Sequence, residues 1–254
     1  MLFRTQGPDV IAISQPMHAW IAGQLLKAWN EALAEPLLLA AEQHDLGWLD
    51  WEVTPSFDET TGRPHLFRDI GASVHAPMWT AAVDRAQGAW GAHVALLISR
   101  HGGVIYRRFT TRHRLSEADG DAARHYLETQ APKERAWASA LGFEEDRLAR
   151  ESALIACVDT LSLALCGELK APLSVEAPRS SSSSGEMQSL QLVEKPGKMF
   201  HFALSPWPFR GSALTIEGEG QALPEGGRLA DAPSMRQWLK TGVRLPFAAR
   251  LSPD

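Results

Sequence analysis

An apolar run leads directly into a His-Asp pair in the segment Leu37-Leu38-Leu39-Ala40-Ala41-Glu42-Gln43-His44-Asp45-Leu46-Gly47-Trp48. The run has the composition of a helix with one buried face, and Glu35-Pro36 before it places a proline where helices often begin. Gly47 is the expected end of this helix. His44 and Asp45 are therefore expected at the end of a helix that belongs to the core.

Two further ionisable side chains lie on other predicted helices. His18 falls in the first turns of a helix that begins at Ser14-Gln15-Pro16, and Asp159 lies beside the apolar face of a helix over residues 144–169. Burying an unpaired ionisable group is costly, and a metal ion offsets that cost. Imidazoles and carboxylates suit divalent Fe, Mn, Zn, Ni or Co, and an incomplete ligand set leaves positions for water or substrate.

A second ion would have ligands of its own. His75 lies early in a helix predicted over residues 73–86, and His101 ends a helix predicted over residues 89–100, which Gly102-Gly103 is expected to stop. Asp45 could then bridge two ions, an arrangement that places hydrolytic metals about 3.5 to 4 Å apart. We therefore expect one or two divalent ions, with Fe, Mn, Zn, Ni and Mg as the candidates.

The order of these residues resembles the HD-domain superfamily of metal-dependent proteins. A His is followed by a His-Asp pair, two separate histidines and a late Asp in an apolar helix, over about residues 14–169. The sequence of residues 17–23, 42–48 and 99–102 is similar to that of an uncharacterised bacterial group within that superfamily. The resemblance implies a metal site made by the four family ligands His18, His44, Asp45 and Asp159, with His75 and His101 as the additional ligands of two-metal branches.

The resemblance also implies a mainly α fold, with an all-helical, HD-like bundle over residues 1–170. The remainder, residues 171–254, changes character at a serine-rich connection, Ser180 to Gly185, that we expect to be flexible. After it, short strands are predicted over residues 190–193, 200–204, 213–216 and 243–248. This smaller strand-rich (α+β) extension is expected to pack on the bundle.

Members of the superfamily are mostly phosphohydrolases, so the resemblance implies a hydrolase of a phosphate ester or nucleotide that uses metal-activated water. Asp45 and His44 would be catalytic, and Arg100, with Arg107, Arg108 and Arg112 nearby, could meet the charge of the transition state; a solvated basic turn is the alternative for these arginines. The irregular segment 49–71 could form a lid that faces the substrate. A di-iron oxygenase of a small polyol or phosphonate, and a non-catalytic metal-binding regulatory protein, stay open as alternatives.

The composition limits the classes of partner that the protein is expected to bind. A net charge of -5 over 254 residues argues against binding to a nucleic acid duplex or an anionic membrane, and favours a small, phosphorylated substrate. The two cysteines indicate a reducing compartment, and neither a secretory signal nor a membrane-spanning apolar run occurs, so we expect a soluble cytoplasmic protein. A nucleophile elbow of the Gly-x-Ser-x-Gly type and a phosphate-binding glycine loop are both missing. A homo-oligomer stays open.

Overall fold

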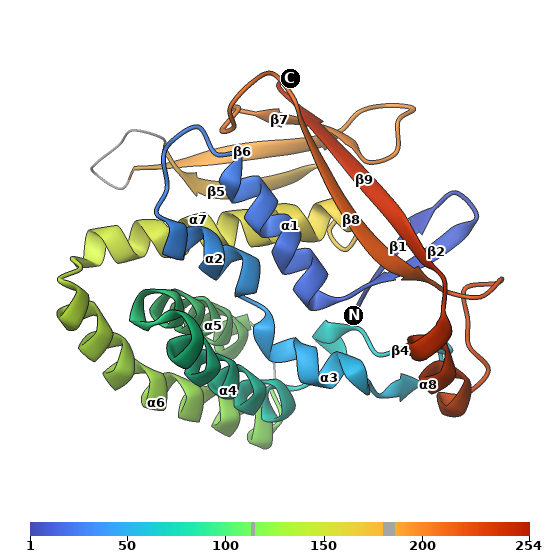
Figure 1. Cartoon of the computed structure of the whole chain (residues 1–254), viewed down its shortest axis with the longest axis horizontal. Helices are drawn as coiled ribbons and strands as arrows, with labels where there is room; N and C mark the ends of the chain where they lie inside the picture. Colours follow the sequence, from blue (N-terminus) through green and yellow to red (C-terminus); the bar gives the residue numbers. More distant parts are fainter. Residues whose placement is uncertain (113–114, 180–185) are drawn as a thin grey trace.

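A seven-stranded curled sheet forms one side of the protein (Figure 1). The computed structural model describes residues 1–112, 115–179 and 186–254, without the side chains of residues 109–112. The strand order is β1-β2-β8-β9-β7-β6-β5, and β7 and β9 are the parallel pair. The strands are β1 Leu2–Gln6, β2 Asp9–Ile13, β5 Leu173–Pro178, β6 Met187–Glu194, β7 His201–Ser205, β8 Leu214–Ala222 and β9 Arg244–Ser252.

Strands from the first and the last part of the chain belong to this same sheet. β1 and β2 form a hairpin, and β2 continues into β8 through the pairs Ile11 with Ala222 and Ala12 with Gln221. Figure 1 shows the blue first strands beside the orange and red strands β8 and β9. Leu2, Ile11 and Ile13 are fully buried. The hairpin is therefore part of the main core, and the chain between β2 and β5 forms most of the helices.

Helices α1 to α7 lie on one side of the sheet, and α8 lies apart from them, at the lower right of the view (Figure 1). α1 contacts β8 and α7 contacts β5, and these two helices also contact each other and α2. α4, α5 and α6 pack together farther from the sheet. The helices are α1 Gln15–Lys27, α2 Glu35–Gln43, α3 Leu49–Val53, α4 Ala72–Trp90, α5 Ala92–Arg112, α6 Glu117–Leu141, α7 Glu145–Leu165 and α8 Ala232–Thr241.

The segment between α2 and α4 has only short elements, as its turn-rich composition predicts. It contains two single 3-10 turns and a two-stranded hairpin besides α3: η1 Leu46–Trp48, β3 Phe57–Asp58, β4 Arg63–Pro64 and η2 Phe67–Asp69. In the part of the chain that the structure describes, each helix is too short or too polar to cross a membrane.

The prediction of a mainly α, all-helical bundle is wrong. The chain is 52% helical and carries a large sheet, which makes it a mixed α/β fold. The sequence does not indicate β2, because a strand of five residues has little periodicity and its partner, β8, lies about 200 residues away. The four strands predicted in the tail are present, and β6, β8 and β9 are longer than predicted, whereas α8 was not expected. The serine-rich connection, Ser180 to Gly185, lies outside the described residues.

The paired glycines 102 and 103 do not stop a helix, as the sequence reading expected, but lie inside α5. A Cβ atom on Gly102 would lie 2.6 Å from the hydroxyl oxygen of Tyr126, a buried side chain of α6. That hydroxyl donates a hydrogen bond of 3.1 Å to the carbonyl of Ser99. Gly102 therefore serves close packing of α6 on α5, next to His101, and the helix is instead preceded by a break at Gly91, whose φ is 88°.

Replacing Gly102 with alanine should destabilise the protein by about 1–3 kcal/mol, because overpacking outweighs the gain in helix propensity. Gly103→Ala is the matched control: its Cβ would meet the end of the Arg107 side chain at 3.2 Å, and we expect a change between zero and a gain of about 1 kcal/mol. Urea unfolding of both variants measures the difference. Equal stabilities would contradict the packing role of Gly102.

Candidate metal site

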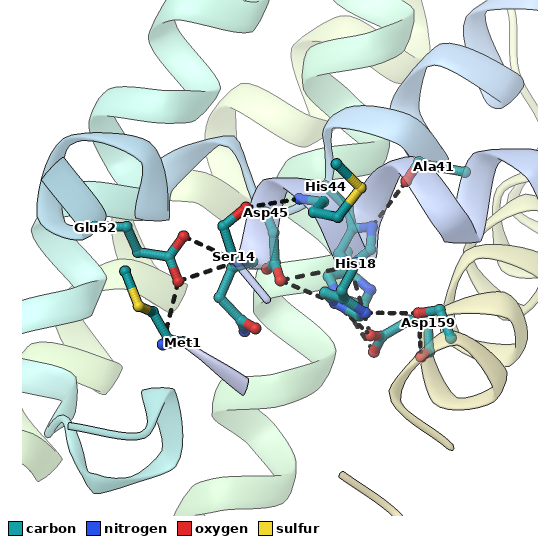
Figure 2. Close-up of polar contacts among 12 residues, drawn as sticks. Met1, Ser14, His18, Ala41, His44, Asp45, Glu52 and Asp159 are labelled. Carbon is teal, nitrogen blue, oxygen red and sulfur yellow. Dashed lines mark hydrogen bonds and ion pairs between the residues drawn. The ribbon is translucent and has the colours of Figure 1, made fainter. Parts of the chain in front are cut away.

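Four side chains from three helical segments point toward one another in the core (Figure 2). α1 supplies His18, α7 supplies Asp159, and His44 and Asp45 follow the last residue of α2. The first turn of α1 is fixed by Ser14, whose side chain accepts a hydrogen bond from Met17 N–H at 3.2 Å. Because α1 contacts both α2 and α7, a side chain on its inner face reaches groups from both helices.

The distances are those of a compact cluster. His18 Nε2 lies 3.0 Å from Asp45 Oδ2 and 3.3 Å from Asp159 Oδ1. His44 Nε2 lies 3.3 Å from His18 Nε2, 3.5 Å from Asp159 Oδ1 and 3.8 Å from Asp45 Oδ2. His18, His44 and Asp159 each offer one ligand atom within 4.8 Å of the others, as a shared cation requires. The four predicted ligands are thus brought together.

The Nδ1 atoms of His18 and His44, which face away from the cluster, each form a hydrogen bond, and these bonds fix the tautomers of both imidazoles. His44 Nδ1 donates to the carbonyl of Ala41 at 2.8 Å. The hydroxyl of Ser162 donates to the carbonyl of Asp159, so it accepts from His18 Nδ1 at 2.6 Å. Both Nε2 atoms therefore direct a lone pair inward unless a proton is added. Two lone pairs 3.3 Å apart need a cation between or beside them, and metal-binding histidines have this arrangement of outer hydrogen bonds.

The charges in the cluster also favour a cation at this place. Burial by itself lowers the pKa of His44, but the carboxylates of Asp45 and Asp159 outweigh it and raise that pKa to about 9. Burial by itself raises the pKa of Asp159. The hydrogen bond to His44 and the charges of the neighbouring histidines outweigh burial and lower that pKa well below its usual range. The buried carboxylate of Asp45 and the half-buried carboxylate of Asp159 thus hold a positive charge at this place. The donor set of imidazoles and carboxylates fits a divalent ion, which would take the place of that proton.

His101 borders the cluster on its α5 side. Its Nε2 lies 3.7 Å from Asp159 Oδ2, whereas Oδ1 of the same carboxylate faces His18 and His44. Burial, and next the positive charge on His44, lower the pKa of His101 to about 4, so it is a neutral donor. Asp159 therefore lies between His101 and the pair His18 and His44. The sequence predicted this bridging position for Asp45.

His75 is held differently from the other histidines. Its Nδ1 lies 2.7 Å from the hydroxyl of Tyr106, on whose ring it stacks, and burial lowers its pKa to about 4. It lies outside the group of three mutually close ligands, but it lines the same pocket as the cluster. Of the predicted additional histidines, the structure brings His101 to the cluster and places His75 on the wall next to it.

Arg100 is not directed at the cluster. Its guanidinium bonds to Glu145 at 2.5 Å and to the hydroxyl of Ser152 at 3.2 Å, and it is absent from the residues that line the pocket. The side chain of Arg112 is outside the described ones. The sequence reading missed Arg68 of η2, which does line the pocket. Only its place in the predicted lid segment, 49–71, could have indicated it.

A pocket of about 230 Å³ opens onto the cluster. His18, Asp45, His101 and Asp159 line it, and aromatic and aliphatic side chains form most of the remaining wall. The segment predicted as a lid contributes Phe67, Arg68 and Ile70. A small molecule in this pocket would therefore reach the carboxylates and imidazoles directly.

The protein is thus a mixed α/β protein with a buried His/Asp cluster at the floor of a pocket. Residues 1–225 match the family model described as "Protein of unknown function (DUF3891)", and the chain belongs to this family. Neither a curated protein nor a solved structure matched the chain. The match runs from β1 through β8 and so includes all the residues of the cluster.

The raised pKa of His44 predicts the pH dependence of the metal-free protein. Its pKa is about 9 when folded and 6.5 ordinarily, so its contribution to the free energy of unfolding is complete below 6.5 and is lost as the pH rises through 9. Chelator-treated protein should lose stability in this range relative to His44→Gln, as measured by urea unfolding from about pH 6 to about pH 10. Parallel profiles of the two proteins would refute the assignment.

Proposed function

We propose that the protein is a metal-dependent hydrolase of a phosphate ester, with its ion or ions held by His18, His44, Asp45 and Asp159. The observation that carries this proposal is the inward direction of the Nε2 atoms of His18 and His44, whose outer nitrogens are bonded to Ser162 and Ala41. The resemblance to HD-domain proteins rests on the same residues. A divalent ion would supply a Lewis acid and lower the pKa of a bound water toward neutrality.

The chain's own groups have separate tasks in such a reaction. Asp45 and Asp159 carry the negative charge that balances the ion, and Ser162 and Ala41 keep the imidazoles of His18 and His44 in place. Trp48 and Trp79 form apolar parts of the pocket wall. In the hydrolysis, the oxygen of water forms a new bond to phosphorus while the ester P–O bond breaks, and the leaving alcohol takes a proton.

Two other functions use the same residues. A di-iron oxygenase of a small polyol or phosphonate would need two ions, and the position of Asp159 between His101 and the His18–His44 pair is compatible with two. A metal-binding regulatory protein would need no turnover. Metal analysis of protein purified without chelator separates them: two irons favour the oxygenase, whereas Mn, Mg, Ni or Zn with phosphatase activity supports the hydrolase. Absence of bound metal would overturn the proposal.

His44→Ala and Asp45→Ala should each remove bound metal and lower phosphatase kcat/KM by at least about a hundredfold, since they delete ligands. The helical fold should persist, because the substitutions remove ligands and no large apolar side chain. His125→Ala, an exposed histidine of α6, is the matched control and should keep both metal and activity. The measurements are metal content, circular dichroism and phosphate release. Full activity of either ligand variant would refute the assignment.

Ser162 should act as a positioning residue through His18. Ser162→Ala removes the acceptor of His18 Nδ1–H, and we expect metal affinity to fall by about 10- to 100-fold. Ser152→Ala is a control on the same helix, because Ser152 bonds to Arg100 instead. Competition with a chromogenic chelator gives the affinities. A merely structural role of Ser162 would lower stability and leave the metal affinity unchanged.

A further inference from the structure

Gln15 lines the pocket, and its buried side-chain Oε1 lacks a hydrogen-bond partner among the described residues. The residue is 2% exposed, and its Oε1 accepts no hydrogen bond from any residue that the structure describes. Its backbone N–H donates to both carboxylate oxygens of Glu52, at 3.0 and 2.9 Å, which fixes the start of α1. A buried acceptor without a donor is costly, so this atom is suited to a donor on a ligand.

Gln15 also lies on the same side of α1 as the metal site. It precedes His18 by three residues, and side chains with this spacing share one face of a helix. Both residues line the pocket. A ligand over the cluster would therefore lie beside Gln15.

Arg68 is the one Lys or Arg side chain among the described residues that line this pocket. It forms an ion pair with Glu168, which follows the end of α7, and its own side chain is 56% exposed. A guanidinium has five N–H donors, so the bond to Glu168 leaves donors for an anion. Its exposure places it at the open edge of the pocket.

The remaining wall limits the size and character of the ligand. Trp48, Phe67 and Trp79 lie around the pocket, and Trp79 is held by a bond of 3.3 Å from its indole N–H to the carbonyl of His44. A volume of about 230 Å³ admits a phosphoryl group with a small organic part.

We infer that the substrate is a small phosphate monoester whose organic part carries a hydroxyl or amino group. This inference rests on the function proposed above. The hydroxyl or amino group donates to Oε1 of Gln15, and Arg68 binds the phosphoryl oxygens from the open edge. Gln15 is then a specificity residue that distinguishes polar from purely apolar esters. Glu168 keeps Arg68 oriented toward the pocket.

Phosphonates test this inference without turnover, because their C–P bond replaces the ester bond. The probes are 2-hydroxyethyl-, 3-hydroxypropyl- and 4-hydroxybutylphosphonate, each paired with the alkylphosphonate that lacks the hydroxyl. Binding to the metal-containing protein is measured by calorimetry under nitrogen, which excludes oxidation. We expect at least one hydroxylated probe to bind about tenfold or more tightly than its alkyl partner, the usual effect of satisfying a buried acceptor.

Gln15→Leu should abolish this preference while leaving the affinity for alkylphosphonates unchanged. Arg68→Gln should weaken both members of each pair by about tenfold or more. Arg85→Gln is the control, because Arg85 pairs with Asp50 on the surface. Equal affinities of paired probes for the wild-type protein, or a preference that survives in Gln15→Leu, would overturn the inference. The wild-type comparison decides even if the Gln15 variant does not fold.

The inference and the proposed function fail in different ways. A protein that hydrolyses phosphate esters but binds paired phosphonates equally would refute the inference and keep the hydrolase. A protein that prefers the hydroxylated phosphonates but hydrolyses no ester would refute the hydrolase and keep the binding site. Absence of binding by all the phosphonates would overturn the inference.

Discussion

The contacts of the His18 imidazole with two carboxylates in the helical core constrain the arrangement of three helices. Asp45 follows α2 and Asp159 belongs to α7, and both lie within 3.3 Å of His18 Nε2. Two carboxylates in an apolar core are costly unless a cation lies between them. In the metal-free protein a proton on His44 has this role, and a divalent ion would perform it with more charge. The position of α1 between α2 and α7 is therefore coupled to the state of the cluster.

The sheet supports this arrangement from outside. α1 contacts β8 and α7 contacts β5, which lie at separate places in the strand order. The β1–β2 hairpin pairs with β8 directly before the chain enters α1, so Ser14 and Gln15 begin the helix from a fixed strand. The bonds from Gln15 N–H to Glu52 fix the same turn from the other side. The rigid start of α1 keeps His18 in register with its partners.

The sequence predicted the cluster better than the fold, and the reason is physical. His18, His44, Asp45 and Asp159 are ionisable residues on apolar helices, a local signal that needs no knowledge of topology. The pairing of β2 with β8 is non-local and involves short strands, so composition and periodicity did not indicate it. Gly102 was misread because a glycine that admits a neighbouring ring has the same sequence pattern as one that ends a helix.

Arginine placement shows a related limit of sequence reading. Arg100 is adjacent to His101, but successive residues of a helix point about 100° apart, so its guanidinium reaches Glu145 and Ser152 on α7. Arg68 is far from every ligand in sequence and still lines the pocket. Two carboxylates offset one divalent ion, so neutral imidazoles leave no surplus positive charge for an anionic ester. A phosphorylated substrate would then require a second ion beside His101 or a guanidinium at the pocket edge, and the described residues supply Arg68 for the second arrangement.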